Sequence, residues 1–106
     1  MNNWSVYDNG RSIGTVSAEG GIILYDEEHS NGARITLRRG NGYVSVSVNI
    51  YSWMDHTRFF TVDSDAQREY KTMKSSLGMV LSMIKTAETK DLKIWEALSE
   101  FVRRFP

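Results

Sequence analysis

Hydrophobic and polar residues alternate in two neighbouring stretches of the first half of the chain, residues 33–39 and 43–51. A period of two residues is typical of strands that turn one face to the core and the other to water. Asn41-Gly42, between the two stretches, is a preferred two-residue hairpin loop. The pattern therefore predicts an antiparallel hairpin with valine, isoleucine and leucine on one face.

The loop decides which residues of this hairpin face each other. An Asn41-Gly42 loop pairs Leu37 with Val46 on the apolar face. A Gly40-Asn41 loop would shift the partners by two residues, and every side chain would keep its face. Both loops therefore predict the same two faces.

Other segments of the first half carry weaker strand signals. Asn9-Gly10 predicts a hairpin loop, and the apolar run at residues 22–25 predicts a strand covered on both faces. Residues 52–56 are expected to form a kink. The further strands are expected at residues 4–8, 11–17, 22–25 and 57–62.

Helical periodicity replaces the alternation after Asp63. Ser64 to Gln67 has the form of a capping box and predicts the start of a helix, while Gly78 indicates close packing or a bend. The apolar stripe of this helix comprises Ala66, Tyr70, Met73, Leu77, Val80, Leu81, Ile84 and Ala87. A second stripe comprises Leu92, Trp95, Leu98, Phe101, Val102 and Phe105.

Together these elements predict a single α+β domain over residues 1–106. We expect an antiparallel β-meander of five or six strands (residues ~3–62), followed by two C-terminal helices (~64–86 and ~91–104) packed on one face of the sheet. The order of strands and then helices resembles the architecture of many small bacterial domains, among them some toxin-neutralising immunity proteins. This resemblance is one of architecture, so it implies no residue roles.

Composition narrows the classes of function. The chain has 106 residues, of which 41% are hydrophobic, and its 13 Lys and Arg balance 13 Asp and Glu. Zero net charge removes the general attraction to nucleic acid or to an anionic membrane. Without cysteine there is no disulfide or thiolate metal site. The first ten residues lack the basic start and apolar run of a signal peptide, and no apolar run approaches membrane-spanning length. We therefore expect a soluble cytoplasmic protein that binds neither nucleic acid nor membrane.

The polar face of the sheet is the first candidate surface. Helices on one side would leave Arg34, Arg38, Tyr43 and Tyr51 on the other side. These side chains would suit an acidic partner, stacking on bases, or a second copy of the chain. Neutral net charge disfavours base stacking, and a plain solvated face is the alternative.

Asp26-Glu27-Glu28-His29 is the densest ionisable cluster, and we expect it at a turn. Because adjacent side chains on a strand alternate, only Asp26 with Glu28, or Glu27 with His29, could point together. Hard cations need several converging oxygen ligands, and this spacing matches no known metal-binding loop. We expect a solvated acidic turn, with no metal and no cofactor.

Asp55, His56 and Arg58 are the second candidate site. A histidine near a carboxylate titrates near neutrality and could act as a general base or a pH sensor, but no nucleophile motif accompanies it. Large apolar residues surround this site, and such residues suit a ligand pocket, a protein-binding hot spot or a corner of the core. They are Tyr51, Trp53, Met54, Phe59 and Phe60.

Two functions are compatible with these features. The first is a non-catalytic protein-interaction module that acts as a homodimer or binds a partner, through the polar sheet face or the Trp53 corner. The second is a small-ligand-binding protein or an enzyme. Its pocket would be formed by Trp53, Asp55, His56 and Arg58, with Glu28, His29 or Arg34 as a further wall.

Overall fold

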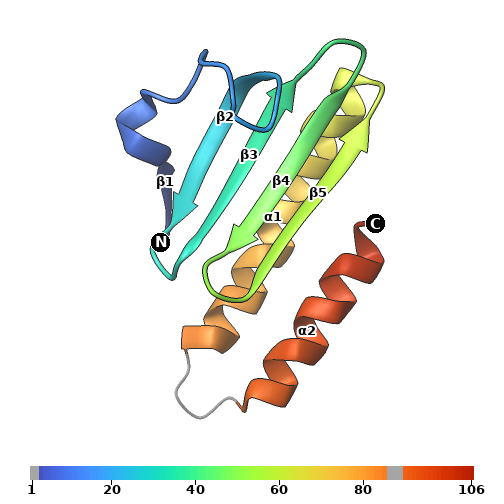
Figure 1. The fold of residues 1–106 in the computed structure, drawn as a ribbon. Helices are drawn as coiled ribbons and strands as arrows, with labels where there is room; N and C mark the ends of the chain where they lie inside the picture. The colour runs from blue at the N-terminus through green and yellow to red at the C-terminus, as the bar shows by residue number, and fades with distance from the viewer. Residues whose placement is uncertain (1–2, 86–89) are drawn as a thin grey trace.

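The computed structural model describes residues 3–85 and 90–106, and the first half of the chain forms a five-stranded antiparallel sheet (Figure 1). The strands lie side by side in their sequence order, which is the predicted meander. They are β1 (Trp4–Val6), β2 (Ile22–His29), β3 (Ala33–Arg39), β4 (Val44–Ile50) and β5 (Met54–Phe60).

The β3–β4 hairpin confirms the Asn41-Gly42 loop. Leu37 faces Val46, and the Gly40 N–H donates to the Tyr43 carbonyl at 2.9 Å, which closes the loop. Gly42 has a φ of 82°, a left-handed conformation that glycine adopts without steric cost.

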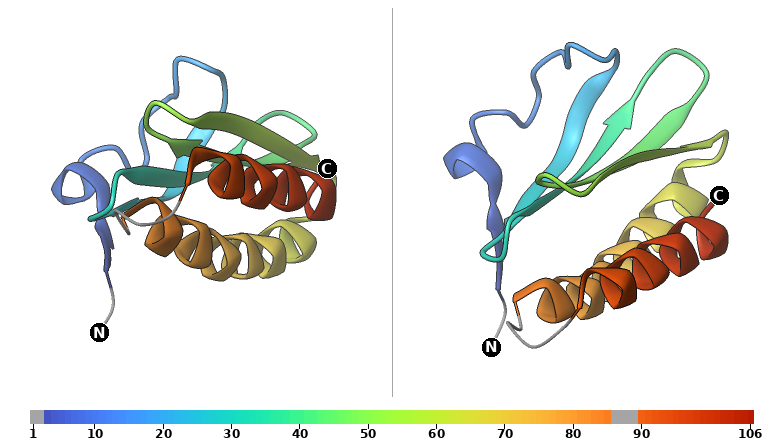
Figure 2. Two further views of the ribbon diagram at one scale, coloured as in Figure 1. Left: turned by 90° about the horizontal axis from the view of Figure 1, so that it is seen from below. Right: turned by 60° about the horizontal axis from the view of Figure 1, so that its bottom comes forward.

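Two helices, α1 (Asp63–Lys85) and α2 (Asp91–Arg104), pack on one face of the sheet (Figure 2). Helix α1 begins one residue before the predicted cap at Ser64, since the Ala66 N–H donates to the Val62 carbonyl at 3.2 Å. Its predicted stripe is confirmed through Ile84, whereas Ala87 lies outside the described residues. The buried members are Ala66, Tyr70, Met73, Leu77, Val80 and Leu81.

The core lies between this helical layer and the apolar side chains of β3 and β4. Alternate residues of both strands are almost fully buried, as the period-two pattern predicts. On the sheet they are Ala33, Ile35, Leu37, Val44, Val46, Val48 and Ile50. The opposite side of the sheet is called the outer face below.

The predicted buried face of α2 is partly wrong. The helix buries Ile94, Leu98 and Phe101, and Phe105 follows them into the core. Leu92 and Trp95, which the prediction placed in the core, are 70% and 50% exposed. Both stripes have helical spacing, so the sequence alone did not decide which of them the sheet would cover.

The predicted N-terminal hairpin is wrong. Strand β1 pairs with the far end of β2, with Trp4 opposite His29, and the chain then turns at Tyr7–Gly10, where Asp8 and Asn9 have positive φ values of 50° and 56°. The backbone of the segment after this turn pairs with the beginning of β2, through a bridge between Val16 and Ile22. A hairpin loop signal gives local geometry only, and here longer-range pairing determined the partner of β1.

Two other segments predicted as turns belong to strands. Strand β2 extends to His29, and β5 begins at Met54. The acidic residues of β2 fit in a strand because they have partners across the sheet and on α1: Asp26 binds Arg34, and Glu27 accepts hydrogen bonds from Tyr70 and Lys74.

Candidate functional site

Asp26 is the centre of a buried polar cluster on the outer face. Its carboxylate accepts two hydrogen bonds from Arg34, at 2.8 and 2.6 Å, and one each from the hydroxyls of Ser12 at 2.7 Å and Thr36 at 3.1 Å. These four donors offset the cost of burying the charge. The hydrogen bond to Asp26 raises the pKa of Arg34, and the guanidinium carbon lies 3.7 Å from the centre of the Tyr7 ring.

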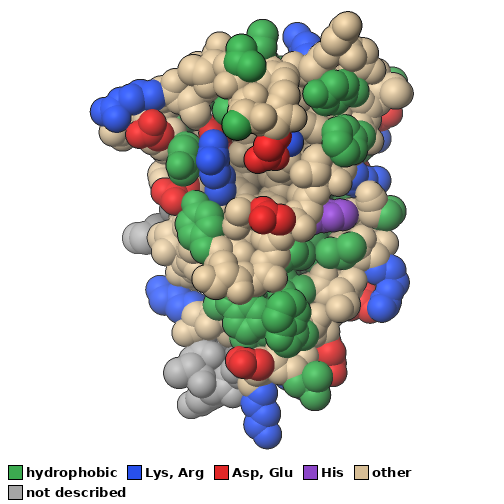
Figure 3. Space-filling view, viewed as in Figure 1, with side chains coloured by type: hydrophobic (Ala, Val, Ile, Leu, Met, Phe, Trp, Pro, Cys, Tyr) green, Lys and Arg blue, Asp and Glu red, His purple; other side chains and the backbone are tan. Residues whose placement is uncertain are grey.

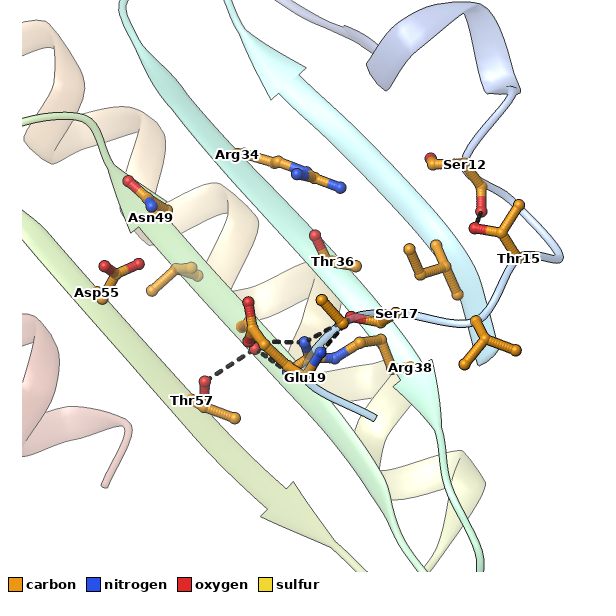
Figure 4. A pocket seen from close by; sticks show the side chains of 15 residues that line it. Ser12, Thr15, Ser17, Glu19, Arg34, Thr36, Arg38, Asn49, Asp55 and Thr57 are labelled. Carbon is orange, nitrogen blue, oxygen red and sulfur yellow. Dashed lines mark hydrogen bonds and ion pairs between the residues drawn. The ribbon is translucent and has the colours of Figure 1, made fainter. Parts of the chain in front are cut away.

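Arg38 is the centre of a second buried cluster on the same face (Figure 4). Its guanidinium donates to Glu19 at 2.8 Å, and to the hydroxyls of Ser17 at 3.3 Å, Ser47 at 2.5 Å and Ser45 at 3.4 Å. Its side chain is 6% exposed, whereas that of Glu19 is 71% exposed. Glu19 thus closes the cluster on the solvent side.

Residues 11–21, called the outer segment here, bring these partners over the sheet. The Gly14 N–H donates to the Ile23 carbonyl at 2.7 Å, and the Ile23 N–H donates to the Thr15 carbonyl at 3.0 Å. Ser12, Ser17 and Glu19 of the segment then reach the two clusters described above. The outer face is therefore partly covered by the chain itself, which the sequence did not predict.

A pocket of about 590 Å³ lies between the outer segment and the sheet (Figure 4). Because both arginines are paired with carboxylates, neither is free to bind an anion. Exposed Asp55 lies opposite Asn49 in the β4–β5 register, and both line the pocket. The polar residues that line it include Ser12, Glu19, Arg34, Arg38, Asn49 and Asp55. The pocket therefore suits a positively charged or hydrogen-bond-donating group.

The structure brings several predicted site residues to the outer face. Glu28 and Arg34 are opposite each other in the β2–β3 register, and the Tyr51 hydroxyl donates to Glu28 at 2.8 Å. Partial burial and this hydrogen bond raise the pKa of Tyr51 to about 12. Tyr43 lies at the other end of the face, with its ring 5.8 Å from that of Phe59.

His29 lies on the helix side, away from these residues, and is buried. The Trp4 ring meets it edge-on at 4.8 Å between ring centres, and its Nδ1 accepts a hydrogen bond from the Asn31 N–H at 3.0 Å. Burial lowers the pKa of His29, and the positive charge of Lys85 lowers it further. These contacts favour a neutral histidine with a packing role.

Asp55 and His56 do not form an acid–base pair, because adjacent residues of β5 face opposite sides of the sheet. His56 donates from Nε2 to the Phe105 carbonyl at 2.5 Å. Arg58 forms an ion pair with Glu69 at 2.7 Å. Both side chains thus link β5 to the helices, and the predicted pocket around Trp53, Asp55, His56 and Arg58 is not assembled.

An apolar groove lies between β5 and α2, beside the predicted Trp53 corner. Its volume is about 410 Å³, and we call it the α2–β5 groove. It is lined by Met54, Trp95, Leu98, Ser99, Val102 and Arg103. The Trp53 and Trp95 rings lie 5.1 Å apart at one end of it. Figure 3 shows hydrophobic side chains gathered at this end of the molecule, near the β4–β5 turn and α2.

Some residues of both sites were missed from the sequence, for different reasons. Trp95 and Val102 were placed in the core, although the competing stripe of Ile94, Leu98, Phe101 and Phe105 has equally good helical spacing. Ser12 and Glu19 carry no sequence signal as site residues. Their roles depend on how the outer segment crosses the sheet. Ser12 is 14 residues from its partner Asp26 along the chain, and Glu19 is 19 residues from its partner Arg38.

Within residues 3–85 and 90–106, no group of three or more His, Asp or Glu side chains is placed to hold a metal ion. In the same part of the chain, no helix is long and apolar enough to cross a membrane.

No protein-family model, no curated protein and no solved structure matches this chain.

Proposed function

We propose that this chain is a non-catalytic protein-interaction module that binds its partner through the α2–β5 groove. The observation that carries the proposal is the exposure of large apolar side chains on α2 at the mouth of this groove. Trp95 is 50% exposed, and Val102 and Leu92 are exposed along the same side of the helix. Clustered apolar residues of this kind mark binding surfaces more often than scattered ones do.

The groove has the composition of a protein-binding hot spot. Tryptophan is enriched among the residues that contribute most to binding, and Trp53 and Trp95 lie together at one end of the groove. Exposed charged pairs on α2, Lys93 with Glu96 and Glu100 with Arg103, would form a polar rim. A partner that covers the groove would therefore bury apolar surface at its centre and keep charges at its edge.

The non-catalytic part of the proposal is supported by the partners of the ionisable side chains. His56 and Arg58 bind the helices, and the buried Asp26 has four donors. These groups already have structural partners, and Asp55 lies on the opposite face from His56.

Self-association is the first measurement, because the partner can be a second copy of the chain. Sedimentation velocity should be compared for the wild type, Val102→Lys and Val16→Lys. Val16 is a matched control, since it is an exposed valine on the outer segment, remote from the groove. If the wild type is a homodimer through this surface, Val102→Lys should be monomeric and Val16→Lys should remain dimeric.

If the wild type is monomeric, the partner is a different protein. A photo-crosslinking residue at position 95, with position 16 as control, should identify it. The purified partner should then bind Val102→Lys about tenfold or more weakly than it binds the wild type and Val16→Lys. The proposal is wrong if position 95 yields no specific product, or if the purified partner binds both variants equally.

A small-ligand-binding function is the second candidate, and the pocket under the outer segment favours it. Asp55 and Asn49 offer polar groups there that suit a cationic ligand. A thermal-shift screen of amines should find compounds that stabilise the wild type more than Asp55→Asn. Equal thermal shifts for the wild type and Asp55→Asn would exclude the pocket as the binding site of these compounds.

A further inference from the structure

We propose that the α2–β5 groove takes an extended segment of a partner chain, which pairs with β5 as a sixth strand. This inference rests on the proposed function and names its partner: a segment with apolar residues at alternate positions and a basic residue between them.

The first observation is the free edge of β5. This seven-residue strand is the last in the sheet, and no other strand within the described residues pairs with its outer edge. Alternate residues of an edge strand present N–H and C=O groups away from the sheet, so the edge is a template for another strand. Pairing of a bound peptide with such an edge is a common mode of recognition.

The second observation is the position of α2. Helix α1 lies behind the sheet, whereas α2, on the same side of the sheet, lies along the β5 edge and extends past it (Figures 1 and 2). The sheet is therefore too narrow to cover the helical layer, and the side of α2 that carries Trp95 and Val102 is left exposed. A strand added to β5 would lie over this side of α2, and its alternate side chains would enter the groove beside Met54.

The third observation is the charge on the other face of β5. Asp55 is exposed, and its side chain forms no ion pair or hydrogen bond with any other described residue. Cross-strand neighbours of opposite charge stabilise strand pairing. A lysine or arginine next to Asp55 on the added strand would supply that neighbour, which is why the segment should alternate apolar and basic residues.

A second copy of the chain does not fit this edge by symmetric pairing. A twofold β5–β5 junction would carry the helices of the second copy under the same edge. Helix α2 already extends past that edge, so the two helical layers would overlap (Figures 1 and 2). The occupant is therefore a segment without a helix of its own beneath it.

A synthetic peptide tests this inference on the full chain. The probe is an acetylated and amidated peptide of about seven residues in which valine alternates with lysine or threonine. Binding should be followed by amide NMR and hydrogen exchange, together with a control peptide that is N-methylated at alternate residues on its β5-facing edge. We expect saturable binding, slower exchange of β5 amides, and about tenfold or greater loss of affinity on N-methylation.

Charge reversal at Asp55 gives a second readout that does not depend on stability. Asp55→Lys should lower the affinity for the lysine peptide and raise the affinity for a peptide in which glutamate replaces lysine. Asp65→Lys, at an exposed site on α1, should change neither affinity. Strand addition would be overturned if the peptide changed the chemical shifts of Trp95 without slowing amide exchange in β5, and if the N-methylated peptide bound equally well. That result would still support docking of apolar residues in the groove. Absence of saturable binding, or a wild-type homodimer through the groove, would also overturn strand addition.

Discussion

Single buried polar residues hold the outer face together, and Asp26 is the central one. It is 1% exposed, and it joins β2 to β3 and to the outer segment through Arg34, Thr36 and Ser12. Removal of one partner of a buried ion pair strongly lowers the free energy of unfolding, because the other charge stays buried without its partner.

Asp26→Ala should therefore destabilise the protein by about 3 kcal/mol, measured by urea unfolding. Asp55→Ala is the matched control. This carboxylate is exposed on the same face of the sheet and lacks a side-chain partner within the described residues, so its loss should change little. Equal effects of the two substitutions would contradict the proposed role of Asp26.

His29 should make stability depend on pH. Its pKa in the folded protein is lowered from 6.5 by burial and by Lys85, so the unfolded chain binds a proton more readily than the folded chain. The contribution of His29 to stability is therefore fully present above pH 6.5 and is lost as the pH falls toward the lower folded pKa. Urea unfolding of the wild type should show this decline below pH 6.5.

His29→Gln removes the titrating group and should flatten this part of the pH profile, even if the variant is less stable throughout. An unchanged slope would assign the pH dependence to other groups.

At the scale of elements, Gly78 in α1 corrects an expectation from the sequence. A methyl group added at Gly78 would meet no atom within 4 Å, so close packing does not require glycine there. Gly21 is different, since its φ is 80° and a Cβ at this position would lie 2.9 Å from the Arg39 carbonyl oxygen.

Gly78→Ala should therefore stabilise the protein by about 1 kcal/mol, because alanine has the higher helix propensity. Gly21→Ala, the contrasting variant, should destabilise it, because alanine is strained at this positive φ and its Cβ would meet the backbone of Arg39. Thermal unfolding of both variants tests this difference. A destabilised Gly78→Ala would show that α1 packs more closely at this point than the structure indicates.

At the scale of the whole molecule, the outer segment is an added layer on a sheet that has helices on its other side. It is held by Arg38 through Glu19 and Ser17, and by backbone hydrogen bonds to the start of β2. Few of its residues are buried, so it should open more readily than the core does.

Arg38→Met keeps an apolar stem on the sheet but removes the contacts with Glu19 and Ser17. We expect faster hydrogen exchange at Ser17 and Gly20, whose N–H groups donate to Gly21 and Ser17 carbonyls, and unchanged exchange in α1. Glu19→Gln should give a smaller change in the same direction. Uniformly faster exchange throughout the chain would instead indicate global destabilisation.

Local patterns predicted the larger part of the fold. The two faces of β3 and β4, the apolar stripe of α1 and the presence of both helices follow from alternation, helical spacing and turn chemistry. These signals act over a few residues, so they can be read directly along the chain.

The candidate sites were less predictable, because they depend on contacts between distant segments. The sequence identified Arg34, Arg38 and Trp53 as candidates, but it did not predict that Glu19 would cover Arg38 or that Trp95 would join Trp53 on the surface. Two apolar stripes of α2 have similar helical spacing, so the sequence also did not determine which side of this helix would be buried.

The sequence by itself determined which side chains share a face of β3 and β4, because side chains alternate along a strand whatever lies above it. Only the tertiary structure decided that the outer segment covers part of the polar face and that α2 lies along the β5 edge. Each placement depends on which of several apolar or polar surfaces pack against each other. The free energy of that packing comes from contacts between residues far apart in the chain, so no local pattern reports it.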